Sequence, residues 1–274
     1  MIGRRIGAYE FESKLGRGGV GTVYRARDHN RRDFVAVKVM HKHLTTQERA
    51  QSRFKREAEV LARLEHPNIV GVLDFLEVEQ DFYMVLEFVR GETLSSGLQR
   101  LGAFSWERCV PWFCEALNAL EYAHGEGIIH RDLKPSNLIV DMSGHVKILD
   151  FGMAKMADAA KQLTAPGMTL GTIAYMSKEQ LLGKELDARS DFYSLGVCLY
   201  EVATGRLPFW SEVDRELALQ IARREPTRPS VLRKGLSAAA DEIILKALSK
   251  DREDRYADAA SFRAALEASC GAKR

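Results

Sequence analysis

The chain has 274 residues, of which 46% are hydrophobic and 28% are charged. This composition is that of a globular protein with a sizeable core, in one or two domains. The formal net charge of +2 is too small to indicate nucleic-acid binding. No stretch approaches the roughly 18 uncharged apolar residues that a membrane span needs, and residues 1–7 lack the apolar run of a signal peptide. We therefore expect a soluble, cytoplasmic chain that makes no membrane contact itself, so that any membrane tether would lie outside residues 1–274.

The four cysteines favour free thiols over a metal site or disulfide bonds. Cys109, Cys114, Cys198 and Cys270 show no C-x-x-C spacing, which is the usual spacing of cysteines that bind a metal. Three of them lie in stretches with helical periodicity. We therefore expect free and buried thiols.

Apolar and polar residues alternate over residues 9–40, with turn signals between the runs. A period of two is typical of strands with one buried face, so an antiparallel strand series is predicted here. Two further runs of this kind surround an acidic turn at residues 77–81. The predicted strands cover residues 9–12, 21–26, 34–39, 70–76 and 82–88.

A glycine-rich stretch at residues 15–23 separates the first two predicted strands. Gly16, Gly18 and Gly21 would let backbone amides approach phosphate oxygens without a Cβ in the way. The spacing G-x-G-x-x-G is weak evidence by itself. A dinucleotide-binding turn would need a helix after Gly21, whereas this sequence continues as a strand, so that type of site is disfavoured.

A helix is predicted from a capping box at residues 45–48 to about residue 64. Glu57 lies on the same stripe as the apolar residues of this helix, whereas Glu59 points about 200° away. A carboxylate on an apolar face needs a cation, because an unpaired charge in a dry site costs several kcal/mol. Lys38, at the end of the strand over residues 34–39, is the natural partner. The alternative is that Glu57 reaches solvent at the edge of the stripe.

Residues 128–140 contain the most concentrated set of reactive groups in the chain. Two apolar runs enclose a histidine, an arginine, a carboxylate, a lysine and an asparagine, which indicates a rigid loop that displays them. Asp132 is a candidate general base, Lys134 can neutralise an anion, and Asn137 offers a neutral oxygen ligand to a hard cation such as magnesium. This combination suits phosphoryl transfer.

A short hairpin is predicted after this loop. Residues 138–140 and 145–149 are apolar and flank the turn sequence at residues 141–144. The hairpin would deliver Asp150 beside Asn137. Asp150 adds the anionic oxygens that magnesium prefers, and nucleotide phosphates and water can complete an octahedron.

Helical periodicity dominates after residue 105. The segment that opens at Asp187 is apolar nearly all round over residues 192–200, which predicts a central buried helix that ends at residues 205–208. Asp191, near the start of this helix, can accept backbone amides as a helix cap does. Helices that pack on the core are predicted at residues 106–124, 212–224, 237–249 and 256–269.

Four motifs together resemble those of the eukaryotic-type protein kinases, and their residues are most similar to those of the bacterial branch. They are G-x-G-x-x-G-x-V at residues 16–23, V-A-V-K at residues 35–38, H-R-D-L-K-P-S-N at residues 130–137 and D-F-G at residues 150–152. The resemblance extends from residue 9 to about residue 266. It implies a single α+β domain with the two-lobed kinase fold: a small antiparallel-sheet lobe with one helix over residues 1–89, and a larger, mainly helical lobe over residues 90–274.

The resemblance also implies how ATP and Mg²⁺ would be used. Lys38, paired with Glu57, would position the α- and β-phosphates of ATP. Asp132 would accept or orient the proton of the substrate hydroxyl, and Lys134 would steady the γ-phosphoryl group. Catalysis would then be mostly placement and charge neutralisation.

The same resemblance assigns the ligands of the metal and of the nucleotide. Asn137 and Asp150 would hold Mg²⁺. Backbone groups near the junction of the lobes would hold the adenine edge, and two apolar side chains would cover its ring. The expected nucleotide-binding residues are Leu15, Gly16, Arg17, Gly18, Gly19, Val20, Gly21, Thr22, Val23, Ala36, Lys38, Glu87, Val89 and Ile139.

Residues 153–171 show no sustained period and resemble an activation segment. Arg131, directly before the candidate base, is a cation that could pair with a phosphate added to this segment. We hypothesise that autophosphorylation of Thr164 or Thr169, through self-association of two copies, orders the segment. The alternative is that both are ordinary loop threonines.

Residues 171–179 match the substrate-side wall of the family with one departure. The family has proline where this chain has Lys178, which frees φ and adds an N–H group, so the rigidity of the wall is in question. The resemblance implies that Glu179 anchors the wall by pairing with Arg255, and that Asp191 clamps the catalytic loop.

Lys134 and Thr172 together indicate serine or threonine acceptors, since tyrosine-specific relatives carry other residues at these positions. The predicted function is therefore an ATP-dependent protein serine/threonine kinase. Two alternatives stay open: a small-molecule phosphotransferase, and a catalytically weak or inactive kinase-like scaffold. The wall favours a peptide acceptor over a small molecule, and the presence of Lys38, Asp132 and Asp150 disfavours a scaffold.

Overall fold

The structure is a computed structural model that describes residues 1–17, 21–40, 59, 61–79, 81–151 and 170–271. The chain forms two compact units, one of which spans Met1–Arg90 and the other of which begins at Gly91. Within these described ranges, no helix has both the length and the apolar character that crossing a bilayer requires. The predicted helix over residues 45–64 lies almost entirely outside the described residues.

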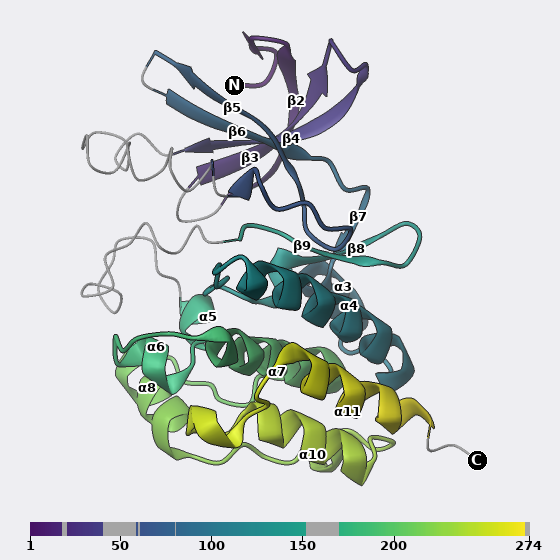
Figure 1. Cartoon of the computed structure of the whole chain (residues 1–274), viewed down its shortest axis with the longest axis vertical. Helices are drawn as coiled ribbons and strands as arrows, with labels where there is room; N and C mark the ends of the chain where they lie inside the picture. Colours follow the sequence, from purple (N-terminus) through teal and green to yellow (C-terminus); the bar gives the residue numbers. More distant parts are fainter. Residues whose placement is uncertain (18–20, 41–58, 60, 80, 152–169, 272–274) are drawn as a thin grey trace. The chain divides into compact units, whose positions relative to one another are not determined.

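The first unit is built on a six-stranded antiparallel sheet with the order β1-β2-β3-β4-β6-β5 (Figure 1). All five predicted strands are present, but β2 continues to Arg17, five residues beyond its predicted end and into the predicted glycine-rich loop, because it stays paired with β3. The additional strand, β1, has only two residues, too few to show alternation. The strands are β1 (Arg5–Ile6), β2 (Tyr9–Arg17), β3 (Gly21–Asp28), β4 (Asp33–Met40), β5 (Val72–Val78) and β6 (Asp81–Glu87).

One face of this sheet carries the core of the unit. Residues opposite each other in antiparallel strands point to the same face, and the register pairs Val37 of β4 with Val85 of β6. Both are fully buried, and they belong to one apolar cluster with Tyr24 and Leu76 packed against it. The buried members of the cluster are Ile6, Tyr9, Phe11, Ala26, Val35, Val37, Tyr83 and Val85.

The second unit is mainly helical. It begins with a small three-stranded sheet in the order β7-β8-β9, formed by β7 (Gly91–Thr93), β8 (Leu138–Asp141) and β9 (Val146–Ile148). Its helices are α3 (Leu94–Leu101), α4 (Trp106–Gly125), η1 (Pro135–Asn137), α5 (Leu170–Ile173), α6 (Lys178–Leu181), α7 (Ala188–Thr204), α8 (Asp214–Arg223), α9 (Pro229–Leu232), α10 (Ala238–Ala247), η4 (Arg252–Asp254) and α11 (Ala259–Gly271).

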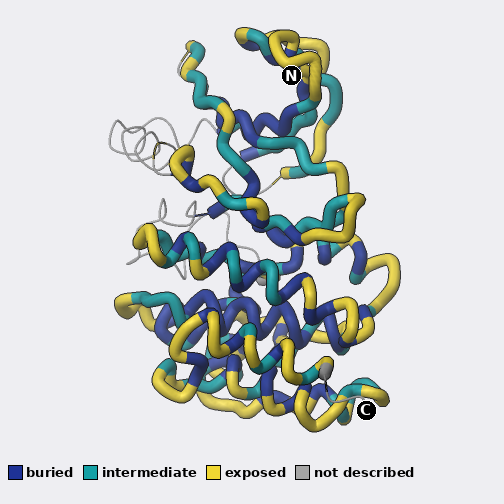
Figure 2. Tube along the Cα trace, turned by 45° about the vertical axis from the view of Figure 1, so that its right-hand side comes forward, coloured by how far each residue is buried: buried dark blue, intermediate teal, exposed yellow. Residues whose placement is uncertain are grey.

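Helix α7 is the core of the second unit. Nearly every residue from 190 to 203 is buried, because α4 and α10 pack against the helix. Figure 2 shows these buried positions among the stacked helices, with the exposed positions on their outer turns. The prediction of a central buried helix is confirmed, and the helix ends at Gly205 as predicted.

The other helical predictions differ in detail. Helices α4, α8, α10 and α11 correspond to the four predicted core-packing helices. Helix α3 was not predicted, because Gly97 at its centre lowers helix propensity. The structure explains that glycine, since a Cβ there would lie 2.5 Å from the ring of Phe104. The four cysteines are free, as predicted, but only Cys109 and Cys198 are buried.

Candidate active site

The polar loop between α4 and β8 is held by one buried carboxylate. Asp191 of α7 accepts hydrogen bonds from the backbone N–H groups of His130 at 2.8 Å and Arg131 at 2.9 Å. Its Oδ2 also lies 2.8 Å from Nε2 of His124. The predicted clamp is therefore confirmed. The N-cap of α7 is Asp187, whose side chain accepts a hydrogen bond from the backbone N–H of Arg189. The carboxylate oxygens of Asp191 instead accept hydrogen bonds from the loop.

The charge of Asp191 is stabilised where it is buried. Burial by itself would raise the pKa of this carboxyl, because a buried charge loses its hydration. The hydrogen bond and charge of His124 and the backbone N–H of Arg131 outweigh that effect and hold the pKa of Asp191 below its ordinary value. Asp191 is thus an anion at neutral pH, as a clamp for N–H groups requires.

His130 joins the loop to the segment after β9. Its Nδ1 accepts a hydrogen bond from the backbone N–H of Asp132 at 3.2 Å, and its Nε2 lies 2.9 Å from the carbonyl oxygen of Leu149. Because a carbonyl can only accept, these contacts assign the proton to Nε2. The ring also packs edge-on against Phe151, with 4.8 Å between the ring centroids.

Asp132 is the partly exposed centre of this arrangement. The Nζ atom of Lys134 lies 3.0 and 2.8 Å from the two carboxylate oxygens of Asp132, and 3.4 Å from Oγ1 of Thr172. The Asp132 side chain is 30% exposed, so a hydroxyl from another molecule can reach it. The site thus combines a proton acceptor, a cation and a neighbouring hydroxyl within hydrogen-bonding distance.

Asn137 and Asp150 provide hard oxygen donors next to this centre. The Nδ2 of Asn137 donates to the backbone oxygen of Asp132 at 2.8 Å. The Oδ1 of the same amide therefore points away from that backbone oxygen. The backbone N–H of Leu149 donates to the carbonyl of Asn137 at 2.8 Å, so the predicted hairpin brings Asp150 beside Asn137. An amide oxygen and a carboxylate are ligands that suit Mg²⁺, and the donor set therefore fits that ion.

Two residues of the loop region have left-handed backbone conformations. Arg131 has φ of 69° and Asp150 has φ of 57°. Such conformations cost a non-glycine residue on the order of 1–3 kcal/mol and persist only where the surroundings fix them. Asp191 fixes Arg131 through its backbone N–H, while the bonds of Leu149 fix the chain before Asp150.

In the first unit, the strand register gathers the predicted nucleotide-binding side chains on one face of the sheet. Val23 lies opposite Lys38, and Ala36 lies opposite Leu86. Because side chains alternate along a strand, Ala36 and Lys38 point away from the core face. Lys38 is 6% exposed and Ala36 is also buried. Glu57, the predicted partner of Lys38, lies outside the described residues.

The glycines of the predicted phosphate loop have different environments. A Cβ on Gly21 would lie 2.5 Å from the carbonyl oxygen of Val39, so β4 itself requires glycine at this position. A Cβ on Gly16 would meet no atom of the described residues within 4 Å. Nothing among the described residues therefore requires a glycine at residue 16. Gly18, Gly19 and Val20 lie outside the described residues.

The remaining predicted nucleotide residues belong to strands or strand ends. Leu15 and Arg17 are in β2, Thr22 is in β3, Glu87 ends β6 and Ile139 is in β8. The backbone N–H of Glu87 donates to the carbonyl of Gly71 at 2.9 Å. The following residues lead through the half-buried Val89 to β7.

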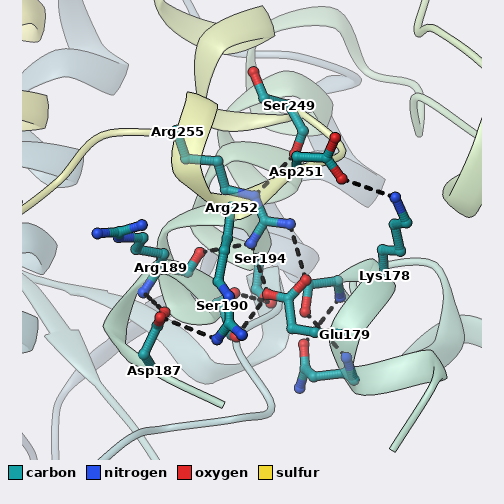
Figure 3. Close-up of polar contacts among 12 residues, drawn as sticks. Lys178, Glu179, Asp187, Arg189, Ser190, Ser194, Ser249, Asp251, Arg252 and Arg255 are labelled. Atoms are coloured by element: carbon teal, nitrogen blue, oxygen red, sulfur yellow. Dashed lines mark hydrogen bonds and ion pairs between the residues drawn. The ribbon is translucent and has the colours of Figure 1, made fainter. Parts of the chain in front are cut away.

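A buried ion pair anchors the wall that follows residue 171 (Figure 3). The guanidinium of Arg255 donates to both carboxylate oxygens of Glu179 at 2.7 and 2.9 Å, and the hydroxyl of Ser190 donates to Glu179 at 2.7 Å. The predicted pairing of Glu179 with Arg255 is therefore confirmed. Burial alone would raise the pKa of Glu179, but the bonds from Arg255, its charge and the Ser190 hydroxyl lower it to about 2.

Lys178 occupies the first position of α6, where the family has proline. Ser177 is the N-cap, with φ of −74° and ψ of 161°, and forms a capping box with Gln180. An extended residue before the first helical position is the conformation that a following proline also favours. The backbone of the wall therefore keeps the geometry that proline would impose. The Nζ of Lys178 donates to Oδ1 of Asp251 at 2.9 Å.

The sequence pattern of the protein kinase domain matches residues 9–267. The chain belongs to the protein kinase family. The serine/threonine-protein kinase PknB of Mycobacterium tuberculosis is 42% identical to it over 263 residues, which cover 94% of this chain and 42% of PknB. The serine/threonine-protein kinase Pkn1 of Myxococcus xanthus is 42% identical over 275 residues, which cover 97% of this chain and 39% of Pkn1. The chain thus spans about two fifths of these relatives.

A solved structure supports the same fold. The crystal structure of the Mycobacterium tuberculosis PknI kinase domain matches with a TM-score of 0.77 and 25% identity, and the match covers 98% of this chain and 99% of that one. The predicted bacterial serine/threonine branch of the family and its predicted two-lobed fold are therefore confirmed. Membership of the family implies the use of ATP.

The structure of the kinase domain also reveals contacts that were not predicted. His124 contacts the buried carboxylate of Asp191, and the side chain of Gln180 donates to the backbone oxygen of Arg131 at 2.8 Å. The sequence carries no periodic signal for either contact, because the first depends on how α4 packs against α7 and the second on how α6 approaches the loop at Arg131.

Proposed function

We propose that this kinase domain transfers the γ-phosphoryl group of ATP, in the presence of Mg²⁺, to serine and threonine hydroxyls of protein substrates. The observation that carries the proposal is the contact of Lys134 with both oxygens of Asp132 and with Thr172. A substrate hydroxyl beside Asp132 would find a proton acceptor there, and the lysine would meet the negative charge of the transferring group.

We assign the remaining roles to residues whose local geometry suits them. Lys38 would position the α- and β-phosphates, with Glu57 as its partner. Asn137 and Asp150 would hold the metal through their oxygens, while the backbone contacts of Asn137 and Leu149 keep these ligands in place. Bound Mg²⁺ would neutralise charge on the phosphates and orient them. The chain would act as a single domain with lobes over residues 1–89 and 90–274.

The acceptors and the cellular setting are also proposals. Thr172 beside Lys134 supports serine and threonine acceptors in proteins, including autophosphorylation of Thr164 or Thr169 by a second copy of the chain. Both of these threonines lie outside the described residues. Four free cysteines and the use of ATP suit the reducing cytoplasm, where we expect the domain to act.

Transfer of radiolabelled phosphate to a generic protein substrate and to the chain itself tests this function. Asp132→Asn keeps the size of the side chain but removes the proton acceptor, so we expect transfer to fall by about 10²–10⁴-fold. Binding of an ATP analogue with Mg²⁺ should survive this substitution. Equal labelling by the two proteins would contradict the kinase assignment. Saturable nucleotide binding by a wild-type chain that transfers no phosphate would instead favour a kinase-like scaffold.

A further inference from the structure

A charged turn at residues 249–255 binds the elements around the substrate-side wall (Figure 3). It carries side chains of both signs, four of which pair with residues of α6 and of the start of α7. One pair is buried and the others are at least partly exposed. The pairs are Lys178 with Asp251, Glu179 with Arg255, Asp187 with Arg252, and Arg189 with Glu253.

Two of these pairs start from adjacent residues of α6. Glu179 and Arg255 have side chains that are 7% and 0% exposed, whereas Lys178 and Asp251 are 33% and 72% exposed. The exposed pair therefore runs beside the buried one and joins the same helix to the same turn. Only the exposed pair depends on the lysine that stands in place of the family's proline.

Helix α6 in turn fixes the wall beside the catalytic loop. Residues 172–177 begin at Thr172, whose hydroxyl lies 3.4 Å from Nζ of Lys134, and end at the N-cap of α6. Between these ends, the hydroxyl of Ser194 donates to the carbonyl of Tyr175 at 2.8 Å. Because Thr172 and Asp132 both contact Lys134, a polypeptide that brings a hydroxyl to Asp132 would lie beside this wall, and its binding would depend on where α6 holds the wall.

We propose that Lys178 is a positioning residue, whose pair with Asp251 holds the start of α6 and thereby residues 172–177 in place for a protein substrate. Proline at this position would keep the backbone geometry but could not make the link. Lysine keeps the same geometry, because the first helical position leaves its N–H without an intrahelical partner in any case, and it adds the link through its side chain. This inference rests on the proposed kinase function.

The exposure of the pair decides which measurement should respond. Exposed ion pairs contribute little to global stability, because solvent screens them and two long side chains lose freedom. The midpoint of thermal unfolding should therefore hardly change when the pair is removed. The placement of the wall should change more, and it is seen in the KM for a protein substrate rather than in the KM for ATP.

The test compares steady-state kinetics of Lys178→Met, Asp251→Asn and the double variant with those of the wild-type chain. We expect each single variant to raise the KM for the protein substrate by about two- to fivefold, as loss of one exposed pair allows. The double variant should show no further increase, since both substitutions remove the same pair. Lys178→Arg should restore the wild-type KM, and kcat and the KM for ATP should change by less than about twofold in every variant.

Lys184 supplies a matched control. It is an exposed lysine of the same neighbourhood whose charge also acts on Asp251, but its side chain has no ion pair or hydrogen bond with any residue that the structure describes. Lys184→Met should leave all the kinetic constants at wild-type values. An increase in KM equal to that of Lys178→Met would mean that net charge matters rather than this pair, and would overturn the proposal.

The sign of the Asp251→Asn effect separates positioning from direct substrate binding. If Lys178 itself bound acidic groups of the substrate, removal of its competitor Asp251 would lower the KM, and that result would also overturn the proposal. So would an unchanged KM in Lys178→Met, or a fall in thermal stability that accounts for the lost activity. A wild-type chain without any phosphate transfer would refute the proposed function instead, and the two failures are thus distinguishable.

Discussion

The polar loop around Asp132 in the second unit and the sheet face of the first unit that we propose binds the nucleotide are held in place by different forces. The loop depends on a buried charge, because Asp191 orients it through two backbone N–H groups. The sheet face depends on strand register and close packing, as the pairing of Lys38 with Val23 and the approach of Gly21 to Val39 show. The loop should therefore be sensitive to the loss of charge, and the sheet face to added side-chain volume.

The largest effect is expected from Asp191→Ala. This substitution leaves two backbone N–H groups and His124 without their buried acceptor. Removal of one partner from a buried pair costs about 3–5 kcal/mol, and we expect a loss of this size in the free energy of unfolding, together with loss of phosphate transfer. Denaturant unfolding of the two proteins measures the first effect directly.

The same helix contains the matched control for this substitution. Asp187→Ala removes the N-cap of α7 and a partly exposed pair with Arg252, four residues from the clamp. A lost cap costs about 0.5–2 kcal/mol, and the catalytic loop should keep its activity. If Asp187→Ala were as damaging as Asp191→Ala, the orientation of the loop by Asp191 would not be the cause.

Acid should weaken the second unit through Glu179. Its pKa is lowered to about 2 in the folded chain, against an ordinary value of 4.5. The stability that this pair contributes is therefore fully present above about pH 4.5 and is lost as the pH falls towards 2. The difference in unfolding free energy between the wild-type chain and Glu179→Gln should narrow over this range, as urea unfolding at several pH values can measure. A difference that stays constant from pH 5 to pH 2.5 would contradict the assignment.

A pair of glycine substitutions tests the first unit by volume. Gly21→Ala would place a methyl group 2.5 Å from the carbonyl oxygen of Val39, and overpacking of this kind costs about 1–3 kcal/mol. The methyl group of Gly16→Ala would meet no atom within 4 Å in the part of the chain that the structure describes, so stability should change by less than about 0.5 kcal/mol. Because the glycines of this stretch are expected to let backbone amides approach phosphate oxygens, Gly16→Ala should still weaken binding of an ATP analogue in a titration. Equal destabilisation by the two variants would refute the difference between these glycines.

The contrast between the two regions also explains what the sequence could predict. Alternation and helical periodicity were enough for five of the six strands of the first sheet, for α4 and for the buried α7, because these elements follow from local patterns and burial. The groups around Asp132 were found because several reactive residue types lie close together in the sequence. Their partners were predicted only where the family resemblance supplied them, as for Glu179 and Arg255.

Contacts that depend on tertiary approach could not be read from the sequence. The sequence does not show that His124 reaches Asp191, because nothing in α4 marks one polar residue as facing another helix. It also gave a single reason for three glycines, whereas Gly21 is required by the backbone of β4. The consequence of Lys178 was undecided for the same reason, since both the cap at Ser177 and the partner Asp251 had to be known.

The smallest effect on stability is expected from Lys178→Pro. The observed backbone already suits proline at this position. A proline that fits the native backbone lowers the entropy of the unfolded chain and so stabilises the fold by about 0.4–1 kcal/mol. Loss of the exposed pair with Asp251 opposes this gain, so the midpoint of thermal unfolding should stay close to that of the wild-type chain. Lys178 would then differ from Asp191. The charge of Asp191 is needed for the fold of the loop, whereas the charge of Lys178 is needed only for the placement of the wall. A large fall in the midpoint of thermal unfolding would contradict this expectation. It would show that residue 178 needs either a φ angle that proline cannot adopt or the backbone N–H group that proline lacks.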